Sequence, residues 1–341
     1  MFKVFVKRFL ISHLPISVVL MYHRISGGKD YYGVCVEPKN FEEHVMIVRK
    51  YACKLDDIFS LKPKGKIFIT FDDGYKDNFD FAKKILEKYD LPAAFFITTG
   101  FLSSKKTWWD ELAEIFQQKL KAKEIYITHE SKKIKVIITQ EDEVSKLDFE
   151  LYNKFRKKMN FFDDTLYLKK SELFVLSYIL LKYSQNPCEK LEDLKKFFEM
   201  GDSLVSYQNS SLFMNDRDLF ELSLNKNFVI GAHTQTHRVL SLLDYKEQEW
   251  EILGSKKILQ EITGKEIFCF AYPFGLEGDF SEITQKICQE NFRYSFSGIK
   301  GVCTRFTPRH KIPRFYIPNC DGEVFERKIF EFFSYLLAWK I

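Results

Sequence analysis

Two adjacent carboxylates, Asp72 and Asp73, stand directly before a glycine in the segment Thr70–Gly74, which reads T-F-D-D-G. The overlapping run Lys66–Phe71 is typical of a buried strand, and parallel-sheet enzymes keep reactive groups at the ends of such strands. Neighbouring residues at a strand end can point to different sides. One aspartate could therefore bind a metal ion while the other stays free to act as a base. The alternative is an Asp-Gly turn whose acids are only solvated.

Two histidines, His233 and His237, follow the apolar run Val229–Ala232. Their i, i+4 spacing would place both imidazoles on one face of a helical turn, which is a zinc-ligand spacing. The chain has only seven histidines, so composition alone does not explain a close pair. With one carboxylate they would leave coordination positions open for water and substrate, as a catalytic metal requires. A zinc protease would be expected to carry glutamate after the first histidine, and that residue is Thr234.

A third segment, Phe270–Gly275, reads F-A-Y-P-F-G and again follows an apolar run. Its proline and glycine predict a fixed loop whose backbone N–H groups could face a ligand, and a plain turn is the alternative.

Taken together and in this order, the three segments resemble the motifs of the NodB-like polysaccharide deacetylases, which form carbohydrate esterase family four. T-F-D-D-G matches the first motif, and H-T-Q-T-H matches the second, H-[ST]-x-x-H. F-A-Y-P-F-G is similar to the third motif of the subgroup that contains poly-N-acetylglucosamine deacetylases, as is the earlier segment L-M-Y-H-R. The resemblance covers about residues 16–107 and 228–318.

The resemblance implies a distorted (β/α) barrel, an α/β fold, with the metal site at the C-terminal ends of the strands. It implies a metal-dependent hydrolase that removes N-acyl groups, with acetyl as the expected group, from amino sugars of a polysaccharide or its precursor. Two alternatives stay open: a deformylase or deacetylase of a lipid-linked sugar in envelope synthesis, and a catalytically silent carbohydrate-binding protein. The implied cofactor is a divalent metal. Zn²⁺ is expected, and Co²⁺, Ni²⁺ or Mn²⁺ also suit one aspartate and two histidines.

The site residues of the family carry over onto the matching positions of this chain. The implied metal ligands are Asp73, His233 and His237. Asp72 is implied as the general base that activates the metal-bound water, and His23 as the general acid for the departing amine. The backbone N–H of Phe274 is implied as the oxyanion donor.

One departure from the family pattern concerns the partner of Asp72. Many members carry an arginine where this chain has Ala271, and that arginine holds the catalytic aspartate. Arg314 is our candidate replacement. The usual fifth motif of the family, L-x-x-H, is not visible after the segment Phe270–Gly275.

Three aromatic residues near these segments are candidates for substrate binding, because aromatic faces pack well on sugar rings. They are Tyr22, Tyr272 and Trp109. For Trp109 the alternative is a buried ring at the start of a helix.

The elements that must position these residues follow from the apolar pattern. Strands are expected at 16–21, 66–71, 93–98, 229–232, 267–271 and 294–296. Helices are expected at 41–51, 77–89, 246–263 and 281–291. This alternation predicts an α/β fold with parallel strands. Residues 111–227 interrupt it and are expected as a mostly helical insertion with a hairpin, so the barrel would comprise 16–110 and 228–318.

Composition narrows the class of protein. The 341 residues, 45% hydrophobic and 29% charged, exclude a disordered or low-complexity chain. A net charge of +5 over this length gives no reason to expect nucleic acid as a partner. Seven scattered cysteines without a C-x-x-C pair favour free thiols in a reducing compartment.

Both ends of the sequence are amphipathic. Residues 1–15 are basic, and the lack of a cleavage site after them predicts no cleaved signal peptide and a cytoplasmic location. Residues 319–341 are expected as an aromatic-rich amphipathic helix. Either end could contact the inner face of a membrane peripherally, and packing on the outside of the barrel is the alternative. His44, on the expected helix 41–51, is expected to be structural.

Overall fold

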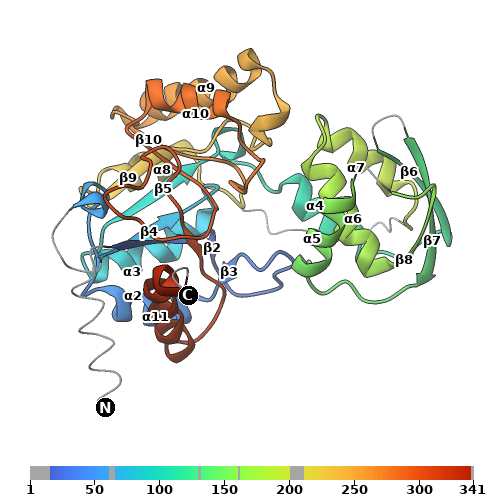
Figure 1. Ribbon diagram of the computed structural model, residues 1–341, viewed down its shortest axis with the longest axis horizontal. Coiled ribbons are helices and arrows are strands. Elements are labelled where there is room, and N and C mark those ends of the chain that lie inside the picture. Colours follow the sequence, from blue (N-terminus) through green and yellow to red (C-terminus); the bar gives the residue numbers. More distant parts are fainter. Residues whose placement is uncertain (1–15, 61–65, 130–131, 160–161, 200–210, 339–341) are drawn as a thin grey trace. The chain divides into compact units, whose positions relative to one another are not determined.

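The apolar runs form a seven-stranded parallel sheet that curls into a half-barrel, which confirms the distorted (β/α) barrel (Figure 1). The computed structural model describes residues 16–60, 66–129, 132–159, 162–199 and 211–338. The strand order is β11-β10-β9-β5-β4-β1-β12. The strands are β1 Ser17–Tyr22, β4 Lys66–Phe71, β5 Ala93–Ile97, β9 Phe228–Ala232, β10 Cys269–Ala271, β11 Tyr294–Phe296 and β12 Phe315–Tyr316.

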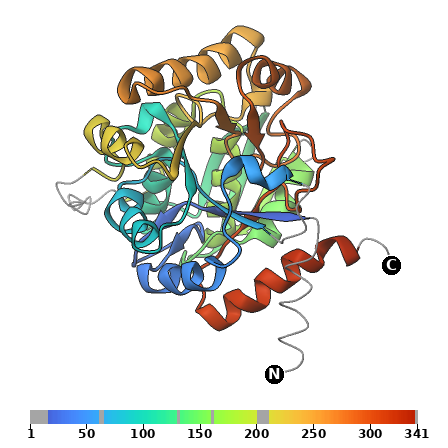
Figure 2. The same cartoon turned by 90° about the vertical axis from the view of Figure 1, so that its left-hand side faces the viewer.

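Helices surround the outer face of this sheet (Figure 2). They are α2 Pro38–Val48, α3 Lys83–Lys88, α8 Asp216–Ser223, α9 Tyr245–Thr263, α10 Glu282–Asn291 and α11 Gly322–Ala338, and a π-helical turn Asn78–Ala82 precedes α3. A short parallel pair, β2 Arg24–Ile25 and β3 Cys35–Val36, follows β1.

The continuous apolar runs reflect burial of the sheet on both faces. In β1, Val18 and Leu20 join the outer core beneath the helices, and Val19 joins an inner core inside the half-barrel. Because the strands are parallel, their C-terminal ends lie at one edge of the sheet. That edge carries the segments after β1, β4, β9 and β10, which are the segments with candidate site residues.

A second compact unit comprises Lys29–Gly33 and Lys105–Ser210 and has its own apolar core. Its sheet consists of β6 Glu124–His129, β7 Lys132–Gln140 and β8 Thr165–Lys169, with β6 antiparallel and β8 parallel to β7. Its helices are α4 Trp108–Ile115, α5 Phe149–Lys158, α6 Lys170–Lys182 and α7 Pro187–Lys195. Its bounds differ from the expected 111–227, because α8 packs on β9 and α9 of the barrel unit.

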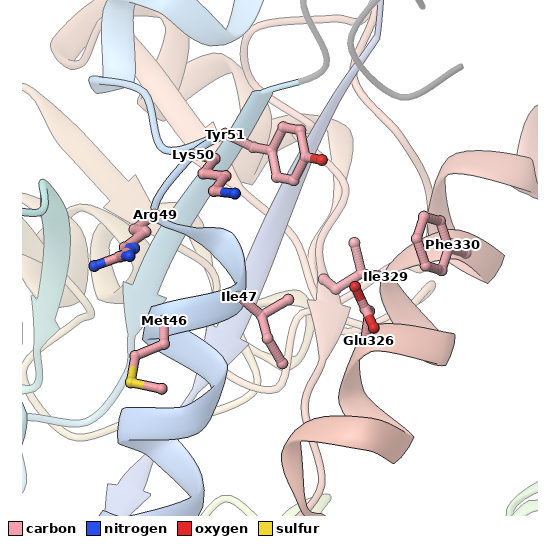
Figure 3. Close-up of a pocket in the computed structure, with 8 residues that line it drawn as sticks. All are labelled: Met46, Ile47, Arg49, Lys50, Tyr51, Glu326, Ile329 and Phe330. Carbon is pink, nitrogen blue, oxygen red and sulfur yellow. The ribbon is translucent and has the colours of Figure 1, made fainter. Parts of the chain in front are cut away.

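Helix α11 packs beside α2 on the outside of the barrel unit, and its Phe325 and Ile329 are buried in the outer core. A groove of about 270 Å³ lies between the two helices (Figure 3), lined by Met46, Ile47, Arg49, Lys50, Tyr51, Glu326, Ile329 and Phe330. The described part of the C-terminal segment thus lies on the barrel, and a membrane contact stays a prediction. Residues 1–15 are outside the described residues. Within the described part of the chain, no helix has the length and apolarity needed to span a membrane.

His44 on α2 links these two helices and gives a first prediction. Its ring is buried, accepts from the Tyr22 hydroxyl at Nδ1 (3.2 Å), donates from Nε2 to the Cys320 carbonyl (2.8 Å) and stacks on Phe325. Burial lowers the pKa of His44 to about 4. In the unfolded chain an imidazole binds a proton near pH 6.5, whereas His44 in the folded protein does so only near pH 4. Acidification from pH 6.5 to 4 should therefore lower the free energy of unfolding by about 3 kcal/mol through this group.

Urea unfolding of the wild type and of His44→Gln across this pH range measures that contribution. The variant should be less stable at pH 7 and should show a shallower loss of stability on acidification. Equal slopes for the two proteins would contradict the assignment.

Candidate active site

The candidate metal ligands meet at the C-terminal edge of the sheet. Asp73, after β4, places its Oδ1 3.4 Å from His233 Nε2 and 3.2 Å from His237 Nε2, both of which follow β9. One ligand atom from each residue lies within 4.8 Å of the others, and all three side chains are buried. The structure therefore brings together the two distant segments that the sequence singled out.

The tautomer of His233 indicates what this cluster can bind. Its Nδ1 lies 2.7 Å from the carbonyl oxygen of Ala271, which only accepts, so Nδ1 carries the proton and Nε2 presents a lone pair towards Asp73. Such an outer hydrogen bond is what fixes the tautomer of metal-binding histidines.

The Asp73 carboxylate also fits a metal-binding role. Its Oδ1 is buried and accepts no hydrogen bond from the described residues. Burial opposes ionisation of this carboxyl, but the imidazoles of His237 and His233 hold its pKa well below its usual range. A buried anion facing imidazole nitrogens fits a divalent cation held by two nitrogens and one oxygen, which leaves further positions for water and substrate.

The histidine segment is a loop in the structure, which corrects the expected helical turn. Thr234 and His237 have left-handed backbones, with φ of 67° and 58°. The Thr234 hydroxyl accepts a hydrogen bond from the His237 N–H at 3.0 Å and supports that conformation. The i, i+4 spacing thus joins two ligands through a tight loop.

Glu251 on α9 anchors this loop and was missed by sequence reasoning. The side chain is fully buried, and its carboxylate accepts hydrogen bonds from the N–H groups of Gln235 and Thr236 at 2.8 and 2.9 Å, and from the Thr236 hydroxyl. In the sequence it is one acid among several on an amphipathic helix. No local signal shows that it lies under the loop.

Glu251→Gln should therefore weaken metal binding without removing a ligand. The amide keeps the volume but carries no negative charge, so the N–H groups of the loop between His233 and His237 lose their charge-assisted hydrogen bonds. We expect an affinity loss of about 10- to 100-fold, as for other residues that orient metal ligands. Competition with a chromogenic chelator measures it. Glu249→Gln, on the same helix and bonded only to Tyr245 at an exposed site, is the matched control and should bind metal normally.

The second aspartate, Asp72, is held by Arg314 in a buried two-pronged ion pair. Both guanidinium Nη atoms donate to the two carboxylate oxygens at 2.7 Å, and both side chains are almost fully buried. Arg314 Nε donates to the Ser297 carbonyl at 2.9 Å, which fixes the guanidinium plane. Burial opposes ionisation, but the nearby Arg314 guanidinium and then the His233 imidazole lower the pKa of Asp72. Asp72 therefore stands beside the cluster as an anion.

The remaining candidate catalytic residues lie at the same edge. His23, which follows β1, lies near enough to Asp72 and Asp73 to contribute to lowering the pKa of both carboxyls. Phe274, after β10, has a left-handed backbone with φ of 57°, and its ring centre lies 4.6 Å from that of His237. The acid role of His23 and the oxyanion role of the Phe274 N–H stay predictions.

The three aromatic substrate-binding candidates are core residues, which corrects their assignment. Tyr22 and Tyr272 each have about 1% of their surface exposed, and Tyr272 stacks on Phe280 and donates to the His310 carbonyl. Trp109 is buried within the second unit. None of these rings offers a face to a sugar. Tyr316 on β12, 37% exposed with its ring centre 6.4 Å from that of His23, has an accessible ring that sequence reasoning missed.

Comparison with known protein families identifies the family to which this chain belongs. The model of the family described as polysaccharide deacetylase matches residues 60–162 and 195–291, more than half of the chain. This chain belongs to the polysaccharide deacetylase family. The chain shares 38% identity over 88 residues with the putative polysaccharide deacetylase YxkH of Bacillus subtilis, a stretch that covers 23% of this chain and 30% of that one.

Several solved structures share the fold of this chain. It is similar to the Streptococcus pyogenes deacetylase PplD, with a TM-score of 0.52, 15% identity and coverage of 90% of this chain and 95% of that one. It is also similar to IcaB from Ammonifex degensii, with a TM-score of 0.53, 13% identity and coverage of 94% and 97%. A third, the putative polysaccharide deacetylase BA0330 of Bacillus anthracis, has a TM-score of 0.54, 18% identity and coverage of 92% and 69%. At these identities the likeness concerns the fold alone.

Proposed function

We propose that this deacetylase hydrolyses the amide bond of N-acetylated amino sugars in a polysaccharide or its precursor, and that its subgroup is that of the poly-N-acetylglucosamine deacetylases. The observation that carries the proposal is the division of labour between adjacent aspartates. Asp73 faces two imidazole nitrogens, whereas Asp72 is held apart by Arg314. The two carboxylates are therefore equipped for different tasks, one as a ligand and one as a proton acceptor.

A divalent metal, expected to be Zn²⁺, would be held by Asp73, His233 and His237 and would supply a Lewis acid that polarises the amide carbonyl and acidifies water. The residues of the chain account for the proton transfers. Asp72 takes a proton from the attacking water through a lone pair that Arg314 leaves available. His23 gives a proton to the departing amine, and the Phe274 N–H stabilises the negative charge on the acyl oxygen. The products are a free amino sugar and the released carboxylic acid.

Metal reconstitution with an assay for released amine tests the proposal. Protein stripped by a chelator should regain about one metal per chain and hydrolyse N-acetylated oligosaccharides, with Zn²⁺, Co²⁺, Ni²⁺ and Mn²⁺ compared side by side. Combining His233→Ala with His237→Ala should abolish both metal binding and amine release. His310→Ala, which removes a histidine outside the cluster, should change neither.

The alternatives make different predictions in the same assay. A silent carbohydrate-binding protein would bind metal and glycan and release no amine with any of the four metals, which would overturn the proposal. A preference for lipid-linked sugars over polymer would identify the precursor as the substrate. Release of formate in place of acetate would identify a deformylase.

A further inference from the structure

The three residues that follow β1 are held by two neighbouring side chains at the start of the π-helical turn. Asn78 Nδ2 donates to the His23 carbonyl at 2.7 Å. Asp77 Oδ2 accepts from Arg24 Nε at 3.0 Å, and Asp77 Oδ1 accepts from the Ile25 N–H at 2.9 Å. Asn78 Nδ2 also donates to Asp77 Oδ1 at 3.0 Å, so the two side chains act as one unit. We call this pair, Asp77 and Asn78, the clamp.

The clamp is buried, and burying polar side chains costs free energy of folding unless they form hydrogen bonds. Asn78 is fully buried, and Asp77 has 8% of its surface exposed. Burial raises the pKa of the Asp77 carboxyl, although Arg24 opposes the shift. The Arg24–Asp77 ion pair is partly buried and adds little net stability compared with apolar packing, which favours a geometric role for it.

The placement of the clamp connects it to the catalytic motif. Asp77 lies four residues after Asp73 along the chain, and Asn78 begins the π-helical turn Asn78–Ala82. A π-helical turn is rare and is frequently found at functional sites. The segment that supplies Asp72 and Asp73 thus also supplies the groups that hold the backbone of His23.

The ring of His23 needs this backbone support. Its Nδ1 is buried and has no hydrogen-bond partner among the described residues, and its ring makes a tilted contact with Tyr316 at 6.4 Å. Because no hydrogen bond to Nδ1 fixes the ring, its direction depends on the backbone from which it projects.

We propose that Asp77 and Asn78 are positioning residues that fix the backbone of His23 and so aim its imidazole at the departing amine. The inference rests on the proposed function in one respect, the role of His23 as the acid. A misplacement of about 1 Å can cost about 100-fold in rate. Asn78→Leu and Asp77→Asn should each therefore lower kcat by about 10- to 100-fold, with KM and metal content unchanged.

A double-mutant cycle separates positioning from general damage to the fold. In a His23→Gln background, the further change Asn78→Leu should alter kcat by less than about twofold, because the group that it positions is gone. An equal loss in both backgrounds, no loss in either, or a loss of bound metal would overturn the proposal. Asp80→Asn is the matched control, because it changes an exposed acid of the same π-helical turn, paired with Lys76, and should leave kcat unchanged.

A measurement independent of activity keeps the clamp testable on its own. The His23 ring signal in a ¹H–¹³C correlation spectrum, assigned by its loss in His23→Gln, should shift or broaden in Asn78→Leu and stay in place in Asp80→Asn. An unmoved signal in Asn78→Leu overturns the clamp. If the wild type releases no amine from any substrate while the ring signal moves as expected, the proposed function fails and the clamp stands.

Discussion

Asp72→Asn is expected to stop amide hydrolysis while the metal stays bound. The amide cannot take the proton of the attacking water, and general-base catalysis contributes about 10²- to 10⁴-fold, so kcat should fall by about that factor. Asp73, His233 and His237 keep their positions, so metal content should stay at one per chain. Amine release and metal analysis on the same preparation check both statements.

The control must remove a buried carboxylate without touching the site. Asp218→Asn does so, because the Asp218 carboxylate is buried, accepts from the N–H of the N-cap residue Asn215 of α8 and pairs with Lys76 at 2.6 Å. The Asp218→Asn variant should release amine at the wild-type rate. If Asp72→Asn hydrolysed as fast as the wild type, the assigned base would be wrong.

Arg314→Met should have the largest effect on stability. It leaves the buried Asp72 carboxylate without its cation, and breaking one side of a buried pair costs about 3 to 5 kcal/mol. Activity should be lost as well, because the two hydrogen bonds that orient the base are gone. Arg314→Lys keeps the charge without the planar fork, so it should retain more stability than activity. Urea unfolding and amine release measure the two effects.

A double variant separates the two roles of the ion pair. Asp72→Leu combined with Arg314→Met replaces both charges by apolar groups of similar size, and such replacements are often neutral or stabilising. Stability should return towards that of the wild type, while hydrolysis stays absent. If the double variant were as unstable as Arg314→Met alone, the unpaired carboxylate could not be the cause of the instability.

The sequence sufficed for the strands and the ligands because both leave local signals. Lys66–Phe71 is a run of apolar residues that forms β4 with the expected bounds, and Asp73 and His233 directly follow strands. Parallel strands bring such residues to one edge whatever the details of the connections. The prediction of Arg314 came from the family resemblance, because the chain has Ala271 where many members carry the arginine that holds the catalytic aspartate.

Other features left no local signal. The loop at His233–His237 looked helical because its spacing fits a helical turn, and the left-handed backbones of Thr234 and His237 are set by contacts with α9 and within the loop. Glu251 accepts hydrogen bonds from residues 15 and 16 positions earlier in the chain, and these contacts become visible only in the folded structure. Tyr22 and Tyr272 were placed on the substrate by motif proximity, yet side chains alternate along a strand and theirs point into the outer core.

The ion pair of Asp72 joins positions 242 residues apart in the chain. During synthesis on a ribosome, the candidate metal ligands Asp73, His233 and His237 all emerge before Arg314. A nascent chain that ends between His237 and Arg314 would contain all three candidate ligands. It would lack the guanidinium that lowers the pKa of the buried Asp72 carboxyl. Addition of β12, next to Arg314, at the edge of the sheet thus supplies the counter-charge of Asp72 only after both ligand segments have been made.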